Sequence, residues 1–205
     1  MEIIKKENLD ITSLVGELKR GATVVYPTET CYGLGCDANN REALDKIFQI
    51  KNRQKNKSVL VVVADLAMIL PYIEWDSTLQ KLADKYWPGP MTLVVKSKQD
   101  CILPPGVVNE DGTIAFRVTK HYLAAEIAKQ LNSPLVSTSA NISEMESPYD
   151  IESVLTMFEN SEVKPDFVID AGTLPHQSPS TIVRFSDGRL EVLRQGGVIV
   201  SLNGS

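Results

Sequence analysis

The sequence is poor in cysteine and histidine and has no long hydrophobic run. Its 205 residues include three scattered cysteines and two histidines, and no apolar stretch approaches the length of a membrane span. The first six residues show neither the apolar core nor the cleavage site of a signal peptide. These absences predict a cytoplasmic protein with no membrane partner and no disulfide framework.

The motifs of several familiar kinds of site are also missing. Neither His121 nor His176 stands at ligand spacing from a cysteine, so we expect no metal site built from protein ligands. There is no Walker P-loop, and Gly33-Leu34-Gly35 lacks the third glycine of the dinucleotide-binding fingerprint. No Ser-His-Asp arrangement is indicated, and His121 is expected to cap a helix or to lie at the surface. Phosphate binding by lysine, arginine and hydroxyl groups, without a covalent nucleophile, fits best.

The charge balance is slightly acidic. Lysine and arginine total 21 against 26 aspartate and glutamate, which gives a net charge of −5. This balance argues against a surface coated for nucleic acid. The positive charges within residues 41–57 are nevertheless dense enough to form a local basic cleft. With 43% hydrophobic and 23% charged residues, the composition predicts one globular domain, residues 1–205, with a full core.

Helical and strand patterns alternate along the chain, which predicts the α/β class. Helices are expected at residues 10–20, 40–50, 76–87, 120–131 and 150–158, and strands at 23–26, 58–63, 91–96, 113–118, 134–138, 166–170, 181–185 and 189–194. Asp10 or Thr12 can cap the first helix, and Gly21 can end it. Ser186-Asp187-Gly188 predicts a final hairpin with antiparallel pairing. We expect a single twisted, mixed sheet with flanking helices.

The most informative stretch joins a short strand to a polar segment. Val24-Val25-Tyr26-Pro27 is followed at once by Thr28-Glu29-Thr30 and then by Gly33-Leu34-Gly35. Proline has no N–H to donate and ends the strand. The two glycines permit positive φ and a turn that lets a ligand approach the backbone closely. We expect this segment to present hydroxyl and backbone N–H groups to a ligand at the edge of the sheet.

Two further segments carry candidate ligand-binding groups. Lys51 and Arg53 lie two residues apart after a helix, so both can reach one anion. A solvated basic turn is the alternative. Ser137, Ser139 and Asn141 follow a strand, where small polar groups suit hydrogen bonds to phosphate or carboxylate. A polar loop that caps the next element is the alternative.

Two arginines stand at informative places in predicted strands. Arg117 lies within the otherwise apolar strand 113–118, and it needs an anionic partner if it points inward. If the strand simply alternates, Arg117 lies on a wet face instead. Arg194 ends the last clear strand and is followed by Gln195-Gly196-Gly197.

Together these segments resemble the YrdC family, the L-threonylcarbamoyladenylate synthases, over nearly the whole chain from residue 23 to about Val200. The resemblance rests on ordered blocks: Tyr26-Pro27-Thr28-Glu29-Thr30 with Tyr32-Gly33-Leu34-Gly35, Lys51-x-Arg53, Trp87-Pro88-Gly89-Pro90-Met91-Thr92-Leu93, Phe116-Arg117-Val118, Ser139-x-Asn141, and Ser180-Thr181-Ile182-Val183 leading to Arg194. A paralogous branch of uncertain function lacks the Ser-x-Asn pair, which this chain keeps. A longer branch carries an extra C-terminal domain, which we do not expect in a chain ending at Ser205.

The resemblance implies a YrdC-like fold with a large concave cleft. It implies that ATP, L-threonine and bicarbonate or CO2 are condensed to threonylcarbamoyl-AMP with release of pyrophosphate. The product serves N6-threonylcarbamoyl modification of the adenosine beside the anticodon of tRNA. The partners implied are therefore tRNA and the downstream threonylcarbamoyl-transfer proteins.

The resemblance also assigns site residues by position. Those for ATP are Lys51, Arg53, Lys57, Thr113, Ser139, Asn141, Ser147 and Arg194. Those for threonine are Thr30, Arg117, Ser137 and Ser180, with Arg117 on the carboxylate. The catalytic set is Lys51, Arg53, Ser139 and Asn141. The chain departs from the family in two places: Lys57-Ser58 stands where many members have Asn-Pro or Lys-Pro, and Val62 stands where some have histidine.

The residues agree physically with that chemistry. The amine of threonine captures CO2, and the resulting carbamate attacks the α-phosphorus of ATP, so two anionic reactants must meet. Lys51, Arg53 and Arg194 supply compensating charge, and Mg²⁺ enters with ATP. One alternative is a non-catalytic module that binds double-stranded RNA or tRNA, although the acidic charge and the lack of interleaved aromatic and basic residues count against it. Another is the paralogous enzyme branch acting on a different nucleotide or RNA.

Overall fold

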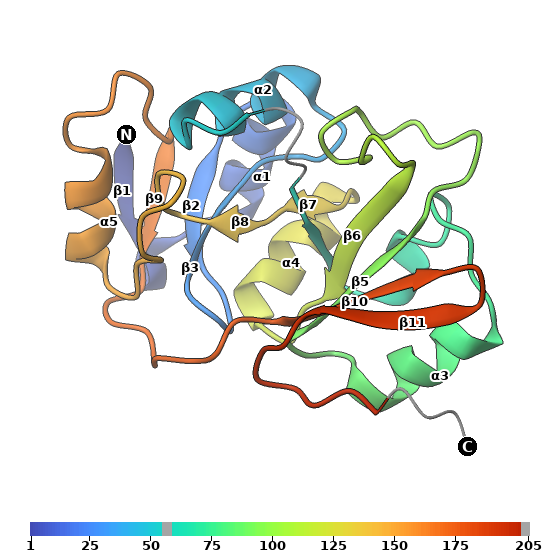
Figure 1. The fold of residues 1–205 in the computed structure, drawn as a ribbon. Coiled ribbons are helices and arrows are strands. Elements are labelled where there is room, and N and C mark those ends of the chain that lie inside the picture. Colours follow the sequence, from blue (N-terminus) through green and yellow to red (C-terminus); the bar gives the residue numbers. More distant parts are fainter. Residues whose placement is uncertain (55–58, 202–205) are drawn as a thin grey trace.

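The computed structural model describes residues 1–54 and 59–201 and confirms the α/β class (Figure 1). One sheet contains, in order, β1 (Glu2–Lys5), β9 (Phe167–Asp170), β2 (Val24–Pro27), β3 (Tyr32–Gly35) and β8 (Thr138–Ser139). The other contains, in order, β11 (Arg189–Arg194), β10 (Thr181–Ser186), β5 (Met91–Lys96), β6 (Thr113–Val118), β4 (Val61–Val63) and β7 (Leu135–Val136). Both sheets are mixed, so the expectation of a single sheet is wrong for the described residues.

The predicted strand at 134–138 shows why one sheet becomes two. It is divided into β7 and β8, with only Ser137 between them. β7 pairs antiparallel with β4 in the six-stranded sheet, whereas β8 pairs antiparallel with β3 in the five-stranded sheet. The chain therefore passes from one sheet to the other at Ser137, and the two sheets meet there.

The predicted helices form close to their expected positions. They are α1 (Ile11–Lys19), α2 (Arg41–Ile50), α3 (Ser77–Tyr86), α4 (Tyr122–Leu131) and α5 (Ile151–Phe158), with short 3₁₀ turns at Lys6–Asn8 and Leu66–Met68. Side chains cap four of them by accepting backbone N–H bonds, and these are Asp10, Asn40, Asp76 and Asp150. His121 occupies the N-cap position of α4 as expected, but its side chain makes no capping bond.

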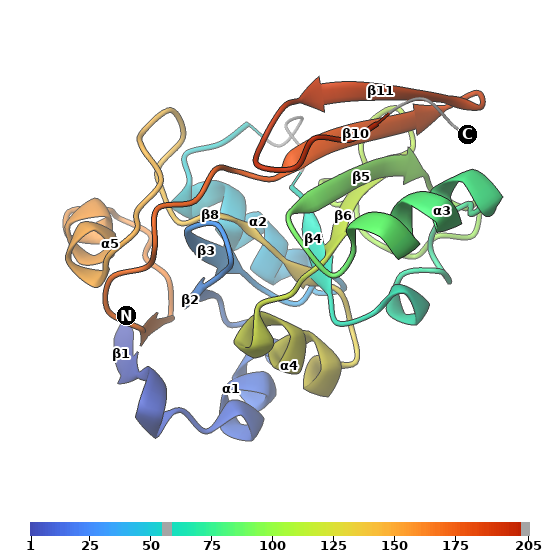
Figure 2. The same cartoon turned by 90° about the horizontal axis from the view of Figure 1, so that it is seen from below.

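The apolar core has two parts. The larger contains residues from both sheets and from α2, and it includes Phe116, whose ring centroid lies 5.1 Å from that of Trp87. The smaller joins α1 and α4 to buried residues of β2 and β4, among them Tyr26 and Val62. Figure 2 shows α1 and α4 together on one side of the molecule, with the β10–β11 hairpin on the opposite side.

The final hairpin forms as predicted. β10 and β11 pair antiparallel, and Asp187 and Gly188 both adopt positive φ, at 52° and 73°. That conformation is the one a tight hairpin turn requires. β10 also pairs in parallel with β5, which fixes the hairpin to the rest of its sheet.

Candidate functional site

A cleft of about 320 Å³ lies where the two sheets meet. The β2–β3 connection and β8 contribute from one sheet, and β5, β6, β10 and the end of β11 contribute from the other. Most of the predicted site residues line it: Thr30, Arg53, Arg117, Ser137, Ser139, Ser147, Ser180 and Arg194. The fold thus brings together residues from distant parts of the chain, as the sequence predicted.

Lys51 and Asn141 are buried and support the cleft wall from behind. Lys51 is 1% exposed, and its Nζ donates to the carbonyl of Ser139, to the carbonyl of Asn141 at 2.7 Å and to Asn141 Oδ1 at 2.8 Å. Ser139 Oγ donates to the same Oδ1 at 2.6 Å. All three donors of a lysine ammonium are therefore directed to oxygens of the protein. Burial, followed by the nearby charge of Arg53, lowers the pKa of Lys51 to about 7.

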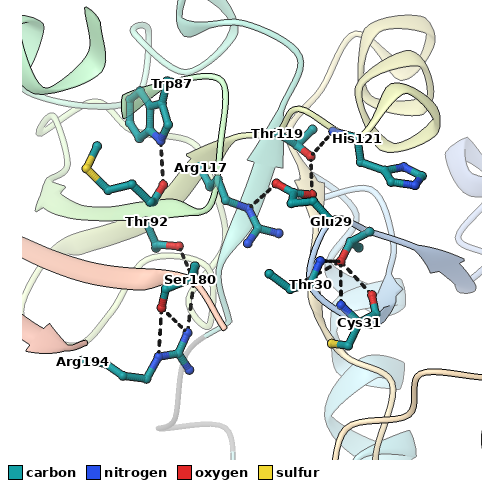
Figure 3. A network of polar contacts seen from close by, with 12 residues as sticks. Glu29, Thr30, Cys31, Trp87, Thr92, Arg117, Thr119, His121, Ser180 and Arg194 are labelled. Carbon is teal, nitrogen blue, oxygen red and sulfur yellow. Dashed lines mark hydrogen bonds and ion pairs between the residues drawn. The ribbon is translucent and has the colours of Figure 1, made fainter. Parts of the chain in front are cut away.

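Arg117 points inward, and a carboxylate of the protein meets it. Its Nε lies 3.3 Å from Glu29 Oε1, and each side chain is only 4% exposed (Figure 3). Thr119 Oγ1 donates to Glu29 Oε2 at 2.8 Å, which fixes the other carboxylate oxygen. The alternative of a wet face is therefore wrong. Glu29 supplies the anion that a buried guanidinium requires, and sequence reasoning had assigned that role to a ligand alone.

Arg194 approaches the cleft from the end of β11. Its Nε and Nη2 donate to the carbonyl of Ser180 at 3.1 and 2.8 Å, and Nη2 also donates to Ser180 Oγ at 3.1 Å (Figure 3). Thr92 Oγ1 donates to the same hydroxyl at 3.0 Å. Desolvation, followed by the positive charge of Arg117, lowers the pKa of Arg194. Two guanidinium groups thus face one cleft, and Glu29 offsets the charge of one of them.

The β2–β3 connection is organised by Thr28. Its Oγ1 donates to the carbonyl of Cys31 at 2.7 Å and accepts from the backbone N–H of Thr30 at 3.1 Å. Gly33 and Gly35 lie in β3 and neither has a positive φ, so the expected Gly-x-Gly turn is wrong. A Cβ at Gly35 would lie 2.2 Å from the carbonyl oxygen of Val136, which means that the protein's own backbone makes the close approach. Gly33 does line the cleft.

Thr113 lies apart from the other predicted residues. It lines a separate hollow of about 530 Å³ with Asp111 and Arg184, and its Oγ1 donates to Asp111 Oδ1 at 2.6 Å. Alternate residues of a strand share a face, so Thr113 is on the same side of β6 as Arg117, at the other end of the strand.

Other parts of the predicted basic segment do not converge on the cleft. Lys46 pairs with Asp166 at 2.6 Å, and Arg41 lines a different hollow. Lys57 and Ser58 lie outside the described residues, so their predicted roles stay predictions. Within residues 41–54, Arg53 is the basic residue that lines the cleft, and burial lowers its pKa.

Sequence reasoning missed one aromatic contact beside the site. Tyr149 lines the cleft and stacks on His176, with ring centroids 3.8 Å apart. The backbone N–H of Leu174 donates to the Tyr149 carbonyl at 2.6 Å. These contacts hold the segment that runs from β9 to β10 beside the cleft. Nothing local in the sequence pairs His176 with a residue so distant along the chain.

Cysteine is present in the cleft, but the described residues form no cluster of metal ligands. The three cysteines are free, and burial raises the pKa of Cys31, which lines the cleft. Within residues 1–54 and 59–201, no group of three or more His, Cys, Asp or Glu is placed to hold a metal ion. No helix in these same ranges is long and apolar enough to span a membrane.

Comparison with known proteins identifies the family. A family model named for Sua5, YciO and YrdC, and described as telomere recombination, matches residues 17–196. The chain belongs to the Sua5/YciO/YrdC family. It is similar to a threonylcarbamoyl-AMP synthase of Thiobacillus denitrificans, with 34% identity over 174 residues, which cover 84% of this chain and 89% of the relative. The resemblance to the YrdC family is therefore confirmed.

Solved structures of the family have the same fold. P. abyssi Sua5 complexed with L-threonine superimposes with a TM-score of 0.85 at 28% identity, covering 96% of this chain. The match spans 57% of the Sua5 chain. E. coli YciO superimposes with a TM-score of 0.81 at 26% identity, covering 96% of this chain and 95% of YciO.

Proposed function

We propose that this family member is a threonylcarbamoyl-AMP synthase that condenses L-threonine, bicarbonate or CO2, and ATP. The observation that carries the proposal is the convergence of Arg117 and Arg194 on one cleft that hydroxyl groups also line. The Thiobacillus denitrificans relative is named for this activity, and the P. abyssi structure contains L-threonine. Both support an amino acid and a nucleotide as the substrates.

In this proposal, threonine binds at the Arg117 end. The planar guanidinium suits a carboxylate, which can accept two parallel hydrogen bonds. Thr30, Ser137 and Ser180 line the same cleft and would supply hydroxyl groups for the polar atoms of the amino acid.

ATP then occupies the end of the cleft near Arg194. Arg53, Ser139 and Ser147 line the same cleft and would contact phosphate or ribose oxygens. Lys51 and Asn141 contribute by holding Ser139 in place. Lys57 and Thr113 remain candidates for the nucleotide. A ligand that reaches both Arg117 and Thr113 must extend about 13 Å along β6, since a strand rises about 3.3 Å per residue.

The reaction proceeds in two steps that balance. The amine of threonine attacks CO2, releases a proton to solvent and becomes an N-carboxylate; when bicarbonate is the donor, that proton leaves instead with the departing oxygen of bicarbonate as water. A carbamate oxygen then attacks the α-phosphorus, and the bond to the β-phosphate breaks as pyrophosphate leaves with its electron pair. Arginine side chains lower the barrier by holding the two anions together and stabilising the charge that develops.

Mg²⁺ is expected to enter with ATP, where it neutralises phosphate charge. Because the described residues offer no cluster of metal ligands, the phosphate oxygens themselves and water fit as its ligands. The product carries an activated threonylcarbamoyl group, which suits transfer to adenosine in tRNA by downstream proteins. We place this reaction in the cytoplasm, where these substrates and tRNA occur.

The proposal is tested by pyrophosphate release from ATP with each substrate omitted in turn. We expect release only when L-threonine and bicarbonate are both present. Release that ignores threonine would indicate the paralogous enzyme branch. No release, together with tight binding of double-stranded RNA, would indicate the non-catalytic module instead. Either result overturns the proposal.

A further inference from the structure

The two arginines of the cleft differ in how their charge is compensated. Arg117 faces the carboxylate of Glu29 at 3.3 Å, in a pair whose side chains are each 4% exposed. Arg194 donates to the carbonyl and hydroxyl of Ser180, which are neutral groups. The Arg117 end of the cleft therefore carries a nearly neutral pair, whereas the Arg194 end keeps a full positive charge.

The geometry of the pair leaves the outer edge of Arg117 available. Glu29 meets the guanidinium at Nε, and Thr119 holds the second oxygen of Glu29 at 2.8 Å. In Figure 3 the two terminal nitrogens of Arg117 point away from Glu29, into the space between Ser180 and Thr30. Glu29 thus offsets the charge of Arg117 at Nε, while the two terminal nitrogens of the guanidinium stay free of Glu29 and can donate to a ligand.

We propose that Glu29 is a positioning residue that sets ligand specificity, reserving Arg117 for the carboxylate of an amino acid and excluding phosphate from that end. This inference rests on the proposed function, because it assigns the two ends of the cleft to threonine and ATP. Glu29 acts through Arg117 and is not itself a catalytic residue.

The physical reason lies in the difference between the two ligands. A zwitterionic amino acid has no net charge, so its carboxylate is selected by hydrogen-bond geometry more than by the field of the site. Pyrophosphate and triphosphate carry several negative charges, and their affinity follows the net charge around them. Glu29 repels a polyanion at Arg117 while leaving the fork intact for a carboxylate. ATP is thereby directed to the Arg194 end, and threonine is not displaced by the phosphates beside it.

The alternative is that Glu29 only stabilises the fold by pairing with a buried cation. That role predicts lower stability for every Glu29 variant and no change in which anion binds. Charge and shape can be separated because Glu29→Gln keeps the size and removes the charge, while Glu29→Asp keeps the charge and shortens the side chain. Glu17→Gln is the matched control, since it removes the same charge from an exposed Arg–Glu pair on α1.

Calorimetric titration with L-threonine and with inorganic pyrophosphate tests the proposal on each folded variant. In the wild type and in Glu17→Gln, we expect saturating pyrophosphate to leave threonine affinity unchanged. In Glu29→Gln, pyrophosphate should bind about tenfold more tightly or better, the order expected when one nearby like charge is removed, and it should compete with threonine. Glu29→Asp should weaken threonine binding without creating that competition. Equal pyrophosphate affinity in Glu29→Gln and wild type would overturn the proposal.

A second measurement uses the unmutated side chain, so it does not depend on the folding of Glu29 variants. In wild-type protein labelled with ¹⁵N on arginine, the Arg117 guanidinium signals are assigned by their absence in Arg117→Lys. We expect L-threonine to shift them and pyrophosphate to leave them unchanged, with the reverse result for Arg194. A shift of Arg117 by pyrophosphate would overturn the proposal. Absence of any threonine binding would contradict the proposed function. The calorimetric comparison of pyrophosphate affinity between wild type and Glu29→Gln would still decide whether Glu29 excludes phosphate.

Discussion

Lys51 Nζ lies 2.8 Å from Asn141 Oδ1, and both groups are buried behind the wall that carries Ser139. The Lys-x-Arg and Ser-x-Asn pairs, distant in sequence, are thus linked directly in space. Lys51 sets the path of the chain at Ser139, and Ser139 in turn faces the cleft.

Loss of Lys51 should therefore lower stability as well as activity. Lys51→Met removes the ammonium donor shared by two carbonyls and one carboxamide in a buried site, and we expect the free energy of unfolding to fall by about 1–3 kcal/mol. Urea denaturation measures this. Lys46→Met is the control, because its partly exposed pair with Asp166 should be worth less than about 1 kcal/mol. Equal loss in the two variants would contradict the supporting role of Lys51.

The pH dependence of stability should also report on Lys51. Its pKa is lowered to about 7 from the ordinary value of 10.5, so the unfolded chain binds a proton more readily between these values. Stability should rise with pH across that window and should not rise further through this group above it. The comparison is the difference in unfolding free energy between wild type and Lys51→Met from pH 6 to pH 10. A difference that falls with pH would contradict the lowered pKa.

Arg117→Lys should affect threonine selectively. Lysine keeps the charge but loses both the fork and the Nε that meets Glu29. We expect the KM for threonine to rise about tenfold to hundredfold, corresponding to about 1–3 kcal/mol for a charged hydrogen bond. ATP affinity measured without threonine should stay close to normal. Arg189→Lys, at the exposed start of β11, is the control. Loss of ATP binding in Arg117→Lys would contradict the prediction and would assign Arg117 to the phosphate site.

Ser139 should act by hydrogen bonding and should form no covalent intermediate. Its hydroxyl donates to the Asn141 carboxamide, which is no base, whereas a serine nucleophile needs one. Intact-mass measurement during turnover should show unmodified protein, and Ser139→Ala should retain measurable pyrophosphate release. An adenylyl or threonylcarbamoyl adduct on Ser139 would refute this.

Gly35 should tolerate no side chain, because a Cβ there would lie 2.2 Å from the Val136 carbonyl oxygen. Gly35→Ala should cost about 1–3 kcal/mol or more by forcing β3 away from the chain between the sheets. Gly16→Ala is the opposite control: its Cβ would meet only the end of Arg20 at 3.8 Å, and alanine in a helix should add about 0.5–1 kcal/mol. Thermal unfolding compares the two variants. Similar melting temperatures would contradict the close approach at Gly35.

Local signals explain what the sequence predicted well. The caps Asp10, Asn40, Asp76 and Asp150 act within their own first turns, and the apolar spacing of the helices is also local, so the helices appear where expected. β1 was missed because it is a short, largely exposed edge strand whose partner β9 comes from the far end of the chain. No local pattern marks Ser137 as the point where the chain changes sheets.

The same distinction applies to the site. Each polar segment could be recognised separately in the sequence. The resemblance to a family then assigned these segments to one site, and the structure shows most of their candidate residues in one cleft. Glu29 could not be paired with Arg117, because that contact depends on the β2–β3 connection of one sheet meeting β6 of the other sheet at the cleft. The requirement that a buried arginine needs an anion was sound. From the sequence we expected that anion to be a ligand, whereas the structure shows that the carboxylate of Glu29 also lies beside Arg117.

The most direct test of the proposed function is isotopic. Wild-type protein is incubated with ATP, Mg²⁺, L-threonine and ¹³C-bicarbonate, and the nucleotides are analysed at once by mass spectrometry. We predict an adenylate that contains one threonine and one ¹³C atom, formed in equal amount with pyrophosphate and absent when threonine is omitted. Pyrophosphate release without a ¹³C-labelled adenylate would contradict the proposal that this cleft makes threonylcarbamoyl-AMP.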